Sequence, residues 1–239
     1  MNPLLHLDYF RKKRLIKGHI AWPDDKMNQM KATGDELGDQ VVADIIQAGS
    51  INQVNELLDH LDQEIPTGGL PLPPGMPSSV HKYLEFFENL PEWAEPARIK
   101  NAQKFFTAHG PSFGISLMFK SLPVLYLGKM GGVQVLNMTG QLRDHFQRRA
   151  AETLQFVLDV MTRGGLKIKE DESGFELGSG IRTIQKIRLM HASVRHYADF
   201  SGQWPQDGSW GVAINQEELV GTMLAFSTVA VDGLTQLGI

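Results

Sequence analysis

Apolar residues recur every three to four positions along most of this chain, and this period is the feature that most restricts its fold. It is the period of amphipathic helices, and few stretches alternate as strands do. Gly, Pro and Asn residues separate the periodic segments and mark the expected helix ends. The sequence therefore predicts an all-α fold, with helices at about 35–48, 51–63, 78–89, 96–109, 111–120, 141–163, 180–200 and 215–237.

The chain of 239 residues is expected to form a single helical domain, 1–239. The Pro- and Gly-rich segment 67–77 cannot be helical, because proline lacks an N–H donor and restricts the residue before it. Apolar helices flank this segment on both sides, so we interpret it as a loop within one domain. The last helix is apolar nearly all round over residues 219–231 and is expected to be buried.

Composition removes several function classes. The chain has no cysteine, which excludes disulfides, iron–sulfur clusters, thiolate-ligated haem and covalent c-type haem. A formal net charge of -4 makes nucleic acid an unsuitable partner. The N-terminus lacks the pattern of a signal peptide, and no stretch reaches the ~18 uninterrupted apolar residues of a membrane span, so we expect a cytoplasmic protein.

The expected helix over 181–198 carries one histidine between two arginines. Spacings of three and four residues put Arg188, His191 and Arg195 on one mainly apolar face. Buried guanidinium groups need anions, so a ligand with two carboxylates and a metal between them explains the pattern, and haem supplies both. The alternative is a hydrogen-bonded core histidine with both arginines in protein salt bridges.

A second expected helix, over 141–156, aligns titratable residues by three- and four-residue steps. The row consists of His145, Arg149, Glu152, Thr153 and Phe156. This row either lines a site or forms an exposed charged face in which Arg149 contacts Glu152 or Thr153. His145 is the rival metal ligand, but no arginine pair flanks it as at His191.

Three segments carry a resemblance to a known family: Arg188–Arg195, Arg149–Thr153 and Asn215–Ser227. They resemble the core of the latex-clearing protein and rubber oxygenase catalytic-domain family, which also contains MpaB-type oxygenases. Shorter matches lie in the same order along the chain, so that the resemblance covers about residues 34–239. These are Gly34–Asp39, Trp93 with Arg98, Ser121–Pro123 and Leu136–Gly140.

The resemblance implies a globin-like helical fold that binds haem b (iron protoporphyrin IX). It implies that His191 ligates the iron, that Arg188 and Arg195 hold the propionates, and that Arg149 and Thr153 lie on the distal side. Two positions depart from the family pattern. Glu152 stands where the rubber oxygenases have a lysine, and the stretch 127–141 lacks the acid that they use there.

Together these features predict a haem-dependent oxygenase-like or peroxygenase-like oxidoreductase that acts on an unidentified hydrophobic organic substrate with O2 or peroxide. Arg149, Glu152 and Thr153 are its expected catalytic residues. A carboxylate beside an arginine suits a proton shuttle for oxygen or peroxide activation. The alternative is a non-catalytic haem sensor or carrier. The Glu-x-x-His pairs of di-iron bundles and the His-Glu-x-x-His zinc motif do not occur in the sequence.

The family's further C-terminal helices have no counterpart after the segment that ends near Phe226. We therefore expect a compact family member, a shortened chain, or a homo-oligomer or partner chain that covers the C-terminal side of the haem pocket.

Overall fold

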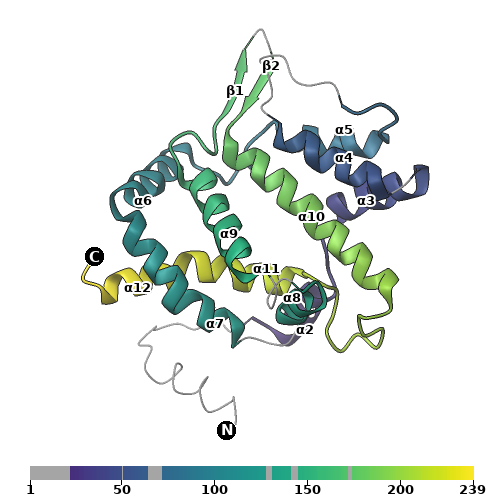
Figure 1. The fold of residues 1–239 in the computed structure, drawn as a ribbon. Helices are drawn as coiled ribbons and strands as arrows, with labels where there is room; N and C mark the ends of the chain where they lie inside the picture. The colour runs from purple at the N-terminus through teal and green to yellow at the C-terminus, as the bar shows by residue number, and fades with distance from the viewer. Residues whose placement is uncertain (1–21, 50, 64–71, 128–130, 141–144, 172–173) are drawn as a thin grey trace.

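A computed structural model describes residues 22–49, 51–63, 72–127, 131–140, 145–171 and 174–239 (Figure 1). The helices are α2 Asp24–Lys31, α3 Glu36–Ala48, α4 Ile51–Asp62, α5 Ser78–Glu85, α6 Pro96–Ser116, α7 Leu122–Tyr126, α8 Gly131–Met138, α9 Phe146–Met161, α10 Ser179–Ser201, α11 Gln216–Leu224 and α12 Ala230–Gln236. Two π-helical turns, η1 Leu117–Ser121 and η2 Ala225–Val229, join α6 to α7 and α11 to α12. Strands β1 Ile168–Asp171 and β2 Gly174–Leu177 pair antiparallel, with Ile168 opposite Leu177.

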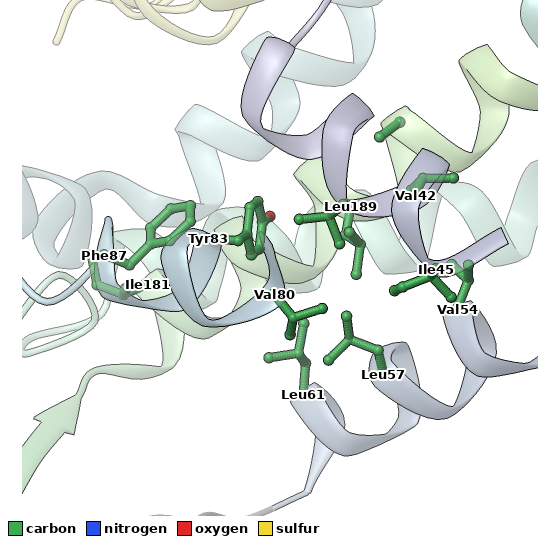
Figure 2. Close-up of a cluster of buried hydrophobic side chains, with 12 residues drawn as sticks. Val42, Ile45, Val54, Leu57, Leu61, Val80, Tyr83, Phe87, Ile181 and Leu189 are labelled. Atoms are coloured by element: carbon green, nitrogen blue, oxygen red, sulfur yellow. The ribbon is translucent and has the colours of Figure 1, made fainter. Parts of the chain in front are cut away.

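Helix α10 runs through the middle of the molecule. Helices α3, α4 and α5 lie on one side of it, and α9 lies on the other, between α10 and α6 (Figure 1). The main core fills the space between α10 and the α3–α5 side (Figure 2). Its fully buried side chains are Val41, Val42, Ile45, Val54, Leu57, Val80, Tyr83 and Leu189. The Tyr83 hydroxyl donates to the Gln185 carbonyl at 2.5 Å, which satisfies the one polar group of this ring in the core.

A second layer consists of α6, η1 and α7 packed against α11, η2 and α12. Phe106, Phe113, Val157, Ala230 and Leu234 form its core. The helices approach closely at Gly233, where an added Cβ would lie 1.9 Å from the Ser116 hydroxyl oxygen. Only glycine fits this crossing.

The prediction of a mainly helical chain is confirmed, and several local predictions are wrong. The predicted break near residue 110 does not exist, because Pro111 lies inside α6. The short helices α2 and α8 and the β1–β2 hairpin were not predicted. The predicted start of the helix over 141–163 falls partly on residues 141–144, which lie outside the described residues.

The last helix differs from its prediction in burial. The helix is continuous over Gln216–Gln236. The Met223 side chain is 58% exposed, and Leu237, directly after the helix, is 54% exposed, whereas the helix was expected to be buried on every side. By length and composition it is the one helix of the described residues that could cross a membrane, and 22% of its most apolar window is buried. The helix contains Glu217, Glu218 and Asp232, so it is not an uninterrupted apolar stretch, and the expectation of no membrane span stays a prediction.

Candidate functional site

Helix α10 is placed by glycines at both ends. It begins after Gly178, whose backbone is extended, and it ends at Gly202 with φ 68°, the left-handed conformation that closes many helices. At Gly180 an added Cβ would lie 2.8 Å from the Asp159 carbonyl oxygen, so the start of α10 packs directly on the end of α9. Thr183 donates to the Asp159 carboxylate at 2.7 Å and fixes the same crossing.

His191 lies midway along α10 and is partly buried. Burial is the largest cause that lowers its pKa, the positive charges of Arg195 and Arg149 also lower it, and the negative charge of Asp35 opposes them; together they bring the pKa to about 4. No described residue hydrogen-bonds its imidazole. His191 is therefore neutral at physiological pH, the form in which a ring nitrogen can ligate a metal.

The polar row predicted on α9 splits into two parts. Arg149, Thr153 and Phe156 are partly buried, and Arg149 is close enough to His191 to lower its pKa. His145 and Glu152, in contrast, are exposed. The structure thus brings Arg149 toward His191 and leaves the rival ligand His145 at the exposed start of the helix.

Glu152 has a different partner from the one expected. Its carboxylate accepts from Arg148 Nε at 2.7 Å, with the two side chains 58% and 77% exposed. Such a pair between residues four apart on a helix surface contributes at most about 0.5 kcal/mol. The expected contact between Glu152 and Arg149 does not form.

Arg188 pairs with a protein carboxylate. Its Nε donates to Asp35 Oδ2 at 2.7 Å and its Nη2 donates to Asp35 Oδ1 at 2.8 Å. The guanidinium carbon also lies 5.1 and 5.2 Å from the ring centres of Phe86 and Phe87. This is the salt bridge that the sequence left open as the alternative to a propionate.

Arg195 is only 4% exposed and is incompletely paired. Its Nε donates to Asp39 Oδ1 at 2.6 Å and its Nη1 to the Ile214 carbonyl at 3.2 Å. Its Nη2 is buried without a hydrogen-bond partner. Ile214 has φ 52°, a costly conformation for a β-branched residue, so the backbone that receives Nη1 is itself strained.

These residues fit an anionic, metal-centred ligand such as haem in two respects. His191 offers a neutral imidazole without a described partner, and Arg195 Nη2 is a buried donor that lacks an acceptor. Arg188 fits less well, since Asp35 already neutralises it. Within the described residues no group of three or more His, Asp or Glu side chains could enclose a metal.

A cavity of about 160 Å³ lies elsewhere, between the start of α6 and the turn before β1, where Ile99, Gln103 and Leu166 line it. It is smaller than the ~300–1,000 Å³ typical of ligand pockets. It includes neither His191 nor Arg149, so it belongs to another part of the molecule.

Glu218 is a candidate that the sequence analysis missed. Burial raises its pKa to about 7, and its Oε2 is buried without a hydrogen-bond partner. An added Cβ on Gly132 would lie 3.7 Å from its carboxyl carbon, which places the carboxyl at the start of α8. A signal was present: Asn215 followed three residues later by Glu218 is the pattern of a capped helix start, and Asn215 accepts from the Glu218 N–H at 3.0 Å.

Three comparisons bear on this arrangement. A family model described as "ER-bound oxygenase mpaB/B'/Rubber oxygenase, catalytic domain" matches residues 112–238, which include α9, α10 and α11. A rubber oxygenase from Streptomyces sp. (strain K30) is 25% identical over 206 residues, or 86% of this chain and 47% of that protein. The chain thus spans about half the length of this relative. No solved structure matches it significantly.

Proposed function

This chain belongs to the family of MpaB-type and rubber oxygenase catalytic domains, and from that premise we propose that it is a haem b-dependent, oxygenase-like oxidoreductase. The observation that carries the proposal is His191, a neutral imidazole without a described partner on the central helix, with Arg149 of α9 close enough for its charge to lower the pKa of this histidine. The substrate class is a hydrophobic organic molecule, and the fold around it is a globin-like helical pocket.

In the proposal, haem bound through His191 supplies the activation of O2 or peroxide. The chain's own residues hold and polarise what binds there. Neutral His191 provides the nitrogen ligand, and the buried Nη2 of Arg195 provides a donor for one carboxylate. Arg149 stabilises negative charge on the oxidant, and the Thr153 hydroxyl positions it by a hydrogen bond.

Two carboxyl groups compete for the proton-carrying role. Glu152, the residue expected from the sequence, pairs with Arg148 on the exposed side of α9. Glu218 is partly buried, and its pKa of about 7 suits a group that both accepts and releases a proton near neutral pH. Glu152 and Glu218 are therefore both candidates for this role, and both are tested.

A non-catalytic haem sensor or carrier is the second candidate. The exposed pairing of Glu152 favours it, because a carrier needs no base beside Arg149. The two functions share His191 and differ in turnover.

The deciding experiment is the absorption spectrum of the purified protein with and without added haem. We expect a Soret band that titrates to one haem per chain, disappears in His191→Ala and remains in the matched control His145→Ala. A protein that binds no haem, or whose spectrum is the same in His191→Ala, would contradict the proposal. Oxidation of a hydrophobic dye driven by peroxide then separates the enzyme from the carrier.

A further inference from the structure

We propose that Gly34–Asp39 forms a clamp on α10, in which Asp35 fixes Arg188 as a positioning residue for His191. We call this segment the α3 clamp. Of the two arginines that the family resemblance assigns to ligand carboxylates, only Arg195 then keeps that role. The role of Arg195 rests on the proposed function, whereas the pairing of Arg188 rests on its hydrogen bonds with Asp35.

The pair of Asp35 and Arg188 is complete in itself. Two parallel hydrogen bonds of 2.7 and 2.8 Å join the guanidinium to the carboxylate, the strongest geometry for such a pair. Burial by itself raises the pKa of Asp35, but the hydrogen bonds and charge of Arg188 outweigh it and lower this pKa below its ordinary value. A second anion at Arg188 would meet the negative charge of Asp35.

The rest of the clamp is built with little free space. Asp39 accepts from Arg195 Nε at 2.6 Å with one oxygen and from the Asp35 N–H at 3.0 Å with the other. An added Cβ on Gly34 would lie 2.7 Å from Asp39 Oδ2 and 3.1 Å from Arg195 Cδ. A side chain at position 34 would thus displace both partners, which explains the glycine.

The α3 clamp contacts α10 before and after His191 in the sequence. Arg188 precedes this histidine by three residues and Arg195 follows it by four, so each lies within about one turn of it. Between them Ala192 packs against Gly38, where an added Cβ would lie 3.4 Å from the alanine Cβ. Fixing the helix at these points sets its rotation, and the direction of the imidazole follows from that rotation.

Arg195 differs from Arg188 in the acceptors it has. Asp39 occupies its Nε and the Ile214 carbonyl occupies its Nη1, but the buried Nη2 has none. A buried donor without an acceptor costs free energy that a ligand carboxylate would recover. Arg195 therefore suits the role that the sequence gave to both arginines.

The first test uses the ligand-free protein. The variants are Asp35→Asn, Arg188→Gln and their combination, with Arg182→Gln as a control on the same helix. Asparagine still caps α3, so only the ion pair changes. We expect each single change to lower the urea midpoint and the combination to lower it by clearly less than the sum, since neither charge is then left alone. Additive losses would overturn the clamp.

The second test compares haem with haem dimethyl ester, which lacks the propionate charges. We expect Arg188→Gln to weaken both ligands by the same factor and to shift the Soret band, with the band restored in Asp35→Asn/Arg188→Gln. Arg195→Gln should weaken haem at least ~10-fold more than the ester, a difference of about 1.4 kcal/mol.

If Arg188→Gln weakens the binding of haem but not of the dimethyl ester, the assignment is overturned, because Arg188 would then bind a propionate. If the wild-type protein binds neither porphyrin, the proposed function fails and the role of Arg195 fails with it. The urea experiment then still tests the pairing of Arg188 with Asp35.

Discussion

The two sides of α10 are built differently. On the side of α3–α5, Leu189 is fully buried among apolar residues, and Asp35 and Asp39 pair with the two arginines. On the side of α9, Thr183 and Asp159 form a hydrogen bond near the start of the helix. His191, between the two arginines along α10, has no described hydrogen bond, and Arg149 of α9 is close enough for its charge to lower the pKa of this histidine.

This difference separates the packed contacts that support α10 from the candidate binding site at His191. Apolar burial and ion pairs hold the middle of α10 from the α3 side, and the contacts of Gly180 and Thr183 with α9 hold its start. A ligand can therefore bind at His191 while the main core stays intact. Rigid support behind an imidazole is what a binding site needs if its geometry is to be kept.

The largest expected effect tests the scaffold side. Leu189→Ala should lower the free energy of unfolding by about 2–5 kcal/mol, since it removes a fully buried side chain from a packed core. Met190→Ala, at a neighbouring position that is 42% exposed, is the control and should cost far less. Urea unfolding measures both. Equal losses would remove the contrast between the two sides of α10.

The next effect tests the site side. Haem at a hundred times its dissociation constant should stabilise the wild-type protein by about 2.7 kcal/mol, seen as a rise in melting temperature. His191→Ala should abolish this rise, and its ligand-free stability should stay close to that of the wild type because no described hydrogen bond is lost. A His191→Ala protein that haem still stabilises fully would place the ligand elsewhere.

A smaller effect concerns Glu218 and depends on pH. Its folded pKa of about 7 exceeds the ordinary value of 4.5, so the folded state holds a proton that the unfolded state releases between these values. Stability should therefore fall as pH rises from about 4.5 to about 7, by ~1–2 kcal/mol after allowance for partial exposure. Glu218→Gln should flatten this slope. Glu217→Gln, the matched control, should keep it.

The smallest effect is expected at Glu152. Because its partner is exposed Arg148, Glu152→Gln should change stability by less than about 1 kcal/mol and leave haem content unchanged. Its rate of peroxide-driven oxidation should match that of Arg148→Gln. A loss of ~10²–10⁴-fold in the Glu152 variant alone would restore the catalytic role inferred from the sequence.

The sequence predicted the long helices well and their partners poorly. The helix around His191 was expected at 180–200 and spans Ser179–Ser201, because its apolar period is long and glycines end it. The carboxylates that meet Arg188 and Arg195 lie 153 and 156 residues earlier in the chain. No local pattern contains that information, since it depends on how α3 packs against α10.

The row on α9 shows a second limit. Steps of three and four residues spread Arg149, Glu152 and Thr153 over a stripe about 100° wide, and the sequence does not say where the packed surface ends. The structure puts that edge between Thr153 and Glu152. Helix α8 and the β1–β2 hairpin were missed because they are too short to show a period.

The span between Asp35 and Arg188 also has a consequence for how the protein is made. At ~5–20 residues per second, a ribosome needs about 8–30 s to add the 153 residues that separate the two. During this interval α3, α4 and α5 have emerged while the helix that completes their core does not yet exist. Val41, Val80 and Tyr83 of the nascent chain must stay unpaired or be shielded by a chaperone until α10 arrives. The side that holds the main core of the finished protein is therefore the side most exposed to misfolding during its synthesis.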